Sequence, residues 1–161
     1  MRFTRIITLA CMAFLLACNA VEQPMSIKEK AQLKASVTET YEAYLDVTET
    51  VSYDDFASYN LFNEDYSIIM DGVISVGGEK AEEMFKGSFS YIKEFVYMNM
   101  MEQEVIVLDR NSAIILASFD EEYVTVSDDT LKVQGAGTYV LELVDEEWKI
   151  VHINAIHKVG E

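Results

Sequence analysis

The side chains best suited to chemistry gather near the C-terminal end of the sequence. Trp148, Ile150, His152, Asn154 and Ile156 alternate along a segment rich in β-branched residues, which predicts that they share one face of a strand. Histidine transfers protons near neutral pH, and asparagine orients ligands through hydrogen bonds. His152 and Asn154 are therefore candidates for two polar groups on the apolar wall of a pocket. The alternative for His152 is a ring whose hydrogen bonds are satisfied by neighbouring protein groups. His157 has the opposite parity, and we expect it on the outer face.

Two tyrosines and an aspartate are the other candidates for acid–base chemistry. Tyr41 and Tyr44 fall on the apolar face of a predicted helix, where their hydroxyls either donate to a ligand oxygen or are satisfied within the core. Asp71 follows a predicted strand, so it is placed to accept a proton as a general base. It also begins an Asp-Gly pair, a common hairpin turn, and turn formation alone explains an aspartate here.

The elements that position these residues are mainly helices first and strands afterwards. Ser26 and Glu29 form a capping-box pair at the start of a long helix whose apolar face extends to Thr48. There follow a short helix at 53–59, strands at 66–70 and 73–76, a helix at 79–95, and strands at 97–108, 113–126, 131–144 and 148–159. This order predicts an α+β domain in which three N-terminal helices pack on a curved, mainly antiparallel sheet of about six strands.

The first residues have the pattern of an export signal that ends in a lipidation site. Arg2 and Arg5 precede an apolar run, residues 6–17, that is shorter than the roughly 20 residues a membrane span needs. Leu15-Leu16-Ala17-Cys18 is similar to a lipobox. The sequence therefore predicts a signal peptide at 1–17, a lipidated cysteine and linker at 18–25, and one domain at 26–161. We expect acyl chains such as palmitate on Cys18 to insert into a lipid bilayer and hold the protein in the bacterial cell envelope, at the outer membrane or on a periplasmic face.

Composition excludes several classes of function. The formal net charge is −16, and it becomes −18 once Arg2 and Arg5 leave with the signal segment, so no nucleic acid is expected as a partner. Cys11 leaves as well and Cys18 takes lipid, which leaves no thiol for a zinc site, a nucleophile or a disulfide. The acidic runs at 120–122, 128–129 and 145–147 lack the spacing of a calcium loop, and we interpret them as solvated strand ends. We expect no metal and no cofactor.

The last predicted strands carry a family resemblance. Gly135-Ala136-Gly137-Thr138-Tyr139-Val140, followed by Trp148-Lys149-Ile150-Val151-His152, resembles the C-terminal signature of SnoaL-like domains in the nuclear transport factor 2 (NTF2)-like superfamily. The resemblance implies a cone-shaped fold over Ser26 to His157, a pocket inside it, and a homodimer through the outer face of the sheet. The chain departs from the signature at Asn154 and Ile156, where the family often has a second histidine and a serine. Asparagine cannot move a proton near neutral pH.

Ketosteroid isomerase, an enzyme of the same superfamily, offers a further comparison. Its general base is an aspartate after the first strand, and a tyrosine on its first helix helps to form the oxyanion hole. Asp71 and either Tyr41 or Tyr44 stand at similar places in this sequence. The second oxyanion partner of that enzyme, a protonated aspartic acid on a later strand, has no clear counterpart here.

Two functions remain open from the sequence. The first is an anchored lipoprotein whose NTF2-like domain binds a small apolar ligand or a protein partner without catalysis, and the incomplete catalytic set favours it. The alternative is an enzyme similar to SnoaL or ketosteroid isomerase, with Asp71 or His152 as the base and Tyr41 or Tyr44 stabilising an oxyanion. The pocket predicted for either function is lined by Tyr41, Tyr44, Trp148, His152 and Asn154.

Overall fold

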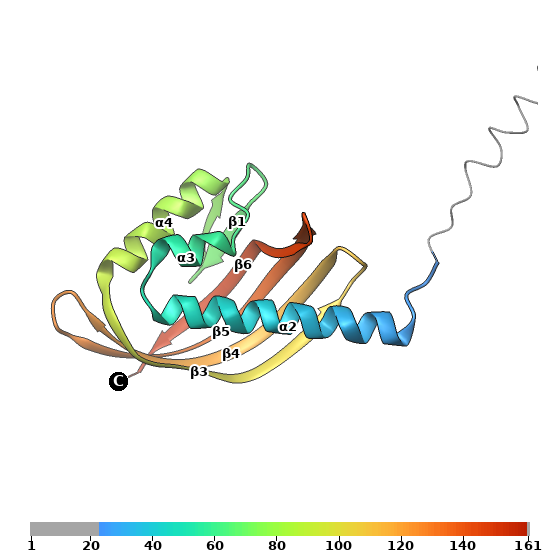
Figure 1. Ribbon diagram of the computed structural model, residues 1–161. Helices are drawn as coiled ribbons and strands as arrows, with labels where there is room; N and C mark the ends of the chain where they lie inside the picture. Colours follow the sequence, from blue (N-terminus) through green and yellow to red (C-terminus); the bar gives the residue numbers. More distant parts are fainter. Residues whose placement is uncertain (1–22, 161) are drawn as a thin grey trace, which may run out of the picture.

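Within residues 23–160, three helices lie against one face of a strongly curved sheet (Figure 1). The computed structural model describes residues 23–160. The predicted signal peptide and lipidation site, residues 1–18, lie outside this range, so both stay predictions. No helix among the described residues is long and apolar enough to cross a membrane.

The sheet has six strands in the order β2-β1-β6-β5-β4-β3. The strands are β1 (Ser67–Met70), β2 (Val73–Val76), β3 (Ile92–Val107), β4 (Ser112–Thr125), β5 (Thr130–Val144) and β6 (Glu147–Val159). All neighbours pair antiparallel except β1 and β6, which are parallel. The four long C-terminal strands form a meander, because each of the first three is followed by a short polar turn that returns the chain beside it. This mixed, mainly antiparallel sheet confirms the predicted fold class.

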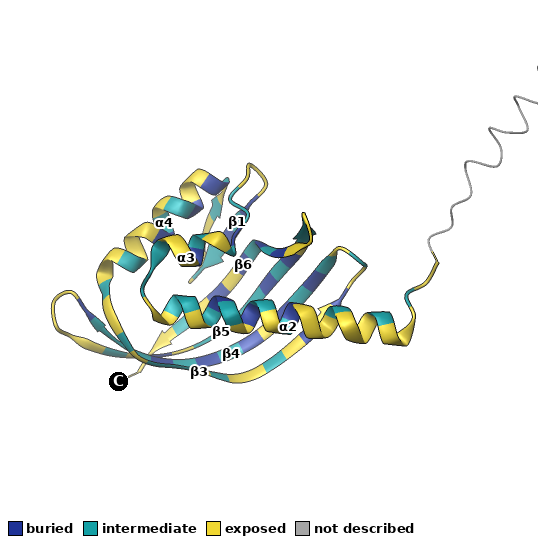
Figure 2. Ribbon diagram, in the orientation of Figure 1, coloured by how far each residue is buried: buried dark blue, intermediate teal, exposed yellow. Residues whose placement is uncertain are grey.

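The long first helix, α2 (Ile27–Glu49), crosses the concave side of the sheet. Its buried residues are Val37, Tyr41 and Tyr44, at spacings of three and four, as an amphipathic helix requires. The shorter helices α3 (Tyr53–Ser58) and α4 (Gly78–Tyr91) add Phe56 and Phe85 to the same core. Figure 2 shows buried positions along the long strands and in the stretch of α2 that crosses them. The core therefore lies between the helices and the concave face.

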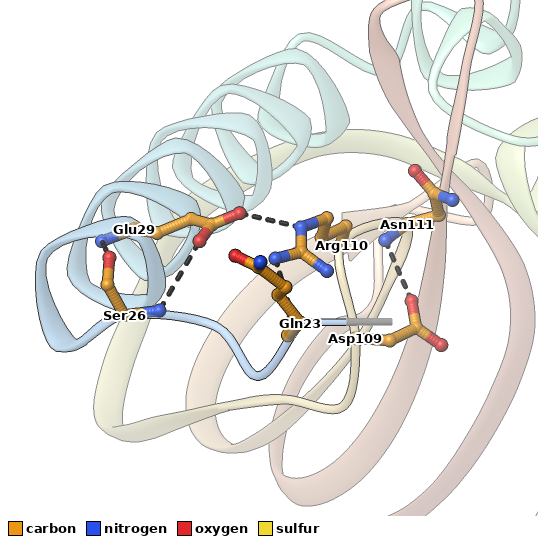
Figure 3. A network of polar contacts seen from close by, with 6 residues as sticks. All are labelled: Gln23, Ser26, Glu29, Asp109, Arg110 and Asn111. Carbon is orange, nitrogen blue, oxygen red and sulfur yellow. Dashed lines mark hydrogen bonds and ion pairs between the residues drawn. The ribbon is translucent and has the colours of Figure 1, made fainter. Parts of the chain in front are cut away.

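A polar network fixes the N-terminal end of α2 (Figure 3). Glu29 N donates to Ser26 Oγ (3.1 Å) and Ser26 N donates to Glu29 Oε2 (3.3 Å), which confirms the predicted capping box. Arg110, in the turn between β3 and β4, donates from Nε to Glu29 Oε1 (2.7 Å) and from Nη2 to the carbonyl oxygen of Gln23 (3.0 Å). The hydrogen bond from Arg110 lowers the pKa of Glu29. One arginine thus ties the start of the domain to the end of the sheet.

The boundary between α4 and β3 differs from the prediction. We expected a helix to residue 95 and a strand from residue 97, but α4 ends at Tyr91 and Ile92 already pairs with Thr125 of β4. The ladder has irregularities between Ile92 and Glu94 and between Phe95 and residue 97. Such bulges insert an extra residue, so residues 92, 95 and 98 all reach the inner side at a spacing of three. In the sequence that spacing looks like one face of a helix.

Candidate functional site

A cavity of about 330 Å³ lies between the C-terminal part of α2, the helix α4 and the concave face of the sheet. Its volume is at the lower end of the range for small-molecule pockets, roughly 300–1,000 Å³. Its aromatic lining residues are Tyr44, Phe56, Phe85, Phe89, Phe95, Phe119, Tyr123 and Tyr139. The lining residues with hydroxyl, carboxyl or imidazole groups, tyrosines aside, are Thr48, Asp71, Ser88, Glu121 and His157. An apolar space with a few polar groups is the composition expected of a ligand site.

Two glycines of β5 let aromatic rings that line the cavity pack closely against the backbone of the sheet. A Cβ atom on Gly135 would overlap the ring of Phe119 and come within 2.9 Å of the carbonyl oxygen of Ile156. A Cβ atom on Gly137 would lie 3.0 Å from the ring of Tyr139. The Phe119 ring rests against the backbone of Gly135, and its centroid is 5.5 Å from that of His157. The Gly-x-Gly pattern of the sequence thus leaves room for the rings of Phe119 and Tyr139.

A carboxylate–imidazole pair lies at the edge of the cavity. His157 Nδ1 is 3.1 Å from Asp71 Oδ2 and 3.2 Å from Asp71 Oδ1, and the backbone N of His157 donates to Oδ1 at 2.7 Å. Because a carboxylate can only accept, Nδ1 carries the hydrogen of this contact, and Nε2 of the neutral ring keeps its lone pair. The Asp71 side chain is half-exposed and that of His157 is 26% exposed. The pair has the composition of a general base with an orienting carboxylate.

The turn of the β1–β2 hairpin places this aspartate. Asp71 and Gly72 have φ angles of 52° and 85°, the left-handed conformations that a tight two-residue hairpin requires. The backbone N of Asp71 donates to the carbonyl oxygen of Ala155 at 3.0 Å, which continues the β1–β6 pairing. The predicted hairpin turn is therefore confirmed, and the same residue also reaches the cavity. Turn formation and a place in the site are compatible.

A second acid, Glu121, enters the cavity from β4. Its side chain lies on the inner face of the strand, and the residue is 8% exposed. Burial, together with the charge of Asp120, raises the pKa of Glu121 to about 7. Glu121 and His157 are separated by two strand spacings across the sheet and by two residues along the strands, or roughly 12 Å between their Cβ positions. The two groups therefore stand on different walls of one cavity.

Tyrosine rings separate the cavity from the deeper core. Tyr44 and Tyr139 line it, and Tyr41 packs behind them with ring centroids 5.8 Å from Tyr44 and 4.8 Å from Tyr139. Burial raises the pKa of all three hydroxyls, so they remain protonated and can donate hydrogen bonds. The Tyr41 hydroxyl is buried and has no hydrogen-bond partner among residues 23–160.

The sequence profile of the SnoaL-like domain family matches residues 37–155, which is most of the chain. The chain belongs to the SnoaL-like domain family. No curated protein sequence matches it.

Solved structures share the fold of this SnoaL-like domain at low sequence identity. A candidate scytalone dehydratase from Novosphingobium aromaticivorans has a TM-score of 0.72 at 9% identity, over 83% of this chain and 89% of that one. A hexachlorocyclohexane dehydrochlorinase has 0.68 at 14% identity, over 84% and 92%. A ketosteroid isomerase-like protein from Erwinia carotovora atroseptica has 0.66 at 12% identity, over 77% and 95%. These likenesses establish the NTF2-like fold.

The structure separates the pocket residues that the sequence suggested. Tyr44 lines the cavity, but Tyr41 is fully buried behind it and Trp148 is buried without lining it. Asn154 is exposed on the opposite face of the sheet, and His152 Nδ1 lies 2.8 Å from Ser67 Oγ on that same face. His157, which we expected on the outer face, lines the cavity instead. Asp71 lines it as well.

One extra residue in β6 explains this exchange of faces. Leu141 pairs with Ile150 and Val140 pairs with His152, so Val151 has no partner and forms a bulge. Before the bulge, Trp148 and Ile150 point inward; after it, Ile153, Ala155 and His157 do. A shift of one residue moves every later side chain to the other face. The simple alternation from Trp148 therefore holds only as far as Ile150.

Sequence reasoning also missed Glu121 as a site residue. It belongs to the acidic run 120–122, which we interpreted as a solvated strand end, but this run lies within β4 and pairs on both sides. The available signal was alternation: Ile115, Phe119 and Tyr123 share the parity of Glu121. An acid flanked at both second neighbours by aromatic residues belongs to an apolar face.

Proposed function

We propose that this SnoaL-like domain is an enzyme that moves protons on a small, largely apolar ligand held in the cavity. The observation that carries the proposal is the contact of the Asp71 carboxylate with the His157 ring at the edge of an aromatic cavity. This is the alternative that the sequence left open, but with His157 rather than His152 as the base. Tyr44 supplies a protonated hydroxyl on the opposite wall.

The arrangement suits abstraction of a proton from carbon. His157 Nε2 takes the proton of an acidic C–H group, and the electron pair of that bond moves into an adjacent carbonyl group. Asp71 stabilises the imidazolium that forms, because its carboxylate already accepts from Nδ1. A donor such as the Tyr44 hydroxyl stabilises the enolate oxygen. Return of the proton from Nε2 to another carbon completes an isomerisation, and loss of a leaving group instead completes an elimination.

The named activities of similar structures support this class of reaction. Three of them are named as a dehydratase, a dehydrochlorinase and a ketosteroid isomerase-like protein, names that stand for elimination of water, elimination of hydrogen chloride and isomerisation. Each of these reactions moves a proton. They indicate that the fold accommodates such chemistry, while the residues proposed here come from this chain alone.

A binding module without catalysis is the second candidate. One observation favours it: the same oxygen of Asp71 that approaches the ring also accepts from the backbone N of His157, so the contact serves to hold the hairpin on β6. In that case the cavity holds its ligand through apolar contact, and the pair has only a structural role.

Exchange of a carbon-bound proton distinguishes the two candidates. Two matched probes are phenacyltrimethylammonium and its uncharged carbon isostere, 3,3-dimethyl-1-phenylbutan-1-one, which both carry a CH₂ group beside a carbonyl. Proton NMR in D₂O measures the loss of the CH₂ signal with and without protein. We expect the protein to accelerate exchange of at least one probe, and His157→Gln to lower that acceleration about 100-fold.

The matched control is His152→Gln, which changes the histidine on the opposite face of the sheet. It should leave the acceleration unchanged, whereas Asp71→Asn should reduce it. Probes that bind without any His157-dependent exchange would overturn the enzymatic proposal and favour the binding module.

We also propose that acyl chains on Cys18 hold the protein in the bacterial cell envelope. The support is the lipobox-like Leu15-Leu16-Ala17-Cys18 behind an apolar run, all of which lies outside residues 23–160.

A homodimer through the outer face of the sheet is a further part of the proposal. Ile106, Leu116 and Ile156 are 41%, 42% and 66% exposed, and strand alternation places them on the face away from the helices. Sedimentation of the purified protein measures its mass in solution, and a monomer at all concentrations would refute this part.

A further inference from the structure

The carboxyl group of Glu121 enters the cavity without a partner in the described part of the chain. It forms no hydrogen bond or ion pair with any of residues 23–160, although the residue is 8% exposed and lines the cavity. By contrast, its neighbours on the other face of β4 are both engaged: Glu122 with Lys132 at 3.1 Å and Asp120 with the Tyr97 hydroxyl at 3.4 Å. A buried carboxyl group without a partner is costly. Because Glu121 lines the cavity, its partner comes from what occupies that space, either water or a ligand that displaces it.

The charge of the surroundings selects the kind of partner. Two of the residues that line the cavity carry carboxyl groups, Asp71 and Glu121, and none of them is a lysine or an arginine. The whole chain has a formal charge of −16. A negative protein with acids inside its cleft attracts cations and repels anions. An anionic ligand is therefore disfavoured at every stage of its approach.

Aromatic rings surround the same carboxyl group. Phe119 and Tyr123 flank Glu121 at the second neighbours on the inner face of β4, and Phe95 reaches the cavity from β3. Tyr44 and Tyr139 are close enough that, after burial, the charge of Glu121 contributes to the raised pKa of both. The faces of aromatic rings attract organic cations, and several rings beside a carboxylate are a common way to bind an ammonium group.

We propose that the ligand of this cavity is a ring-bearing organic cation, an amine or a quaternary ammonium compound, whose positive charge lies against the carboxylate of Glu121. The ring system lies among the phenylalanines, and the acidic C–H group reaches His157. The inference rests on the proposed ligand cavity and names the chemical class of its ligand. It makes Glu121 the residue that determines specificity, separate from the pair that moves the proton.

The proposal implies a pH dependence of binding. The titratable groups that face Glu121 are Tyr44 from α2, Tyr123 from β4, Tyr139 from β5, and the Asp71–His157 pair across the cavity, with Asp120 behind it on the same strand. Since the pKa of Glu121 is about 7, its ionised fraction rises about tenfold between pH 6 and pH 8. The affinity for a permanent cation should rise by about the same factor over this interval.

The test uses the two probes introduced above, because they differ only in the charge at one atom. Calorimetric titration of the purified protein at pH 6 and pH 8 gives the Kd of phenacyltrimethylammonium and of its carbon isostere. At pH 8 we expect the cation to bind at least about tenfold more tightly. Glu121→Gln should abolish the preference for the cation, together with the rise in cation affinity between pH 6 and pH 8 that ionisation of Glu121 causes. It should change the Kd of the uncharged probe by no more than about twofold.

The matched control is Glu122→Gln, which removes a carboxylate from the opposite face of the same strand. It should keep the preference for the cation. His157 is present in all these proteins, so its own effect on binding cancels in the comparison.

Equal binding of the two probes, or a preference that survives in Glu121→Gln, would overturn the inference. Tighter binding of the uncharged probe at pH 6 would indicate a carbonyl ligand that accepts from protonated Glu121. The two proposals fail separately. Tight binding of the cation without proton exchange refutes only the enzymatic function, and exchange of an uncharged probe that binds equally well refutes only the ligand class.

Discussion

Replacing Glu121 with glutamine should stabilise the protein, and by an amount that depends on pH. Burial, with the charge of Asp120, raises the pKa of Glu121 from the ordinary 4.5 to about 7. Between these values the native state holds a proton that the unfolded chain has released. The free energy of unfolding of the wild type therefore falls as pH rises, by about 1.4 kcal/mol per pH unit. The contribution is fully present below pH 4.5 and is lost by about pH 7.

The size of the effect follows from that window. Between pH 4.5 and about pH 7 the free energy of unfolding of the wild type falls by about 3 kcal/mol. A glutamine at this position has no ionisable group, so the variant does not lose this stability. We expect Glu121→Gln to be more stable than the wild type by about 3 kcal/mol at pH 8, and the two proteins to converge near pH 4.5. In a domain of this size the difference at pH 8 corresponds to about 10 °C in Tm.

Thermal and urea denaturation at pH 5, 6, 7 and 8 measure the effect. Glu122→Gln is the control, because it removes a carboxylate from the same strand whose partner, Lys132, is 68% exposed. This change should alter the free energy of unfolding by less than about 1 kcal/mol. A gap between the wild type and Glu121→Gln that is the same at pH 5 and pH 8 would refute the argument from burial.

Three further predictions concern other parts of the chain. Cys18→Ser should leave the protein unacylated in cells labelled with a fatty-acid analogue, and unchanged label would contradict the lipoprotein proposal. Gly135→Ala should lower the free energy of unfolding by roughly 1–3 kcal/mol, because the added Cβ would overlap the ring of Phe119. Gly87→Ala, on α4, adds its Cβ to open space and should not lower the free energy of unfolding. Equal melting temperatures of the two variants would contradict this. Arg110→Gln should lower the free energy of unfolding by less than about 1 kcal/mol, because the ion pair of Arg110 with Glu29 is partly exposed. The same change should speed amide hydrogen exchange at the start of α2. Unchanged exchange would show that the network is dispensable.

The fold could be predicted because periodicity in the sequence reports directly on local structure. Ser26 and Glu29 marked the start of α2 within one residue, and Asp71-Gly72 marked the hairpin. The one large error in an element, the end of α4, arose where bulges gave inward residues of β3 a helical spacing. Periodicity therefore fails at places where the ladder is irregular.

The site was less predictable, for the same physical reason. The bulge at Val151 moves every later side chain of β6 to the other face of the sheet. Alternation in the sequence therefore predicted His152 and Asn154 in the pocket, whereas the structure places Ile153 and His157 in the cavity. No residue type in the segment signals an extra residue in the ladder. Asp71 and Tyr44 were found because each stands at a position, a tight turn and a helix face, that local pattern determines.

The length of α2 has a consequence for how an anchored protein meets its ligand. The network of Arg110 holds Gln23 and the first turn of α2 at one end of the domain, and α2 runs from there along the sheet (Figure 1). Tyr44 and Thr48, near the other end of α2, border the cavity. At 1.5 Å per residue, about 20 helical residues separate the two by roughly 30 Å. That is the thickness of the hydrocarbon core of a bilayer. In a chain tethered before residue 23, the length of α2 thus sets the greatest distance, roughly 30 Å, that the cavity can lie beyond the anchored end of the domain.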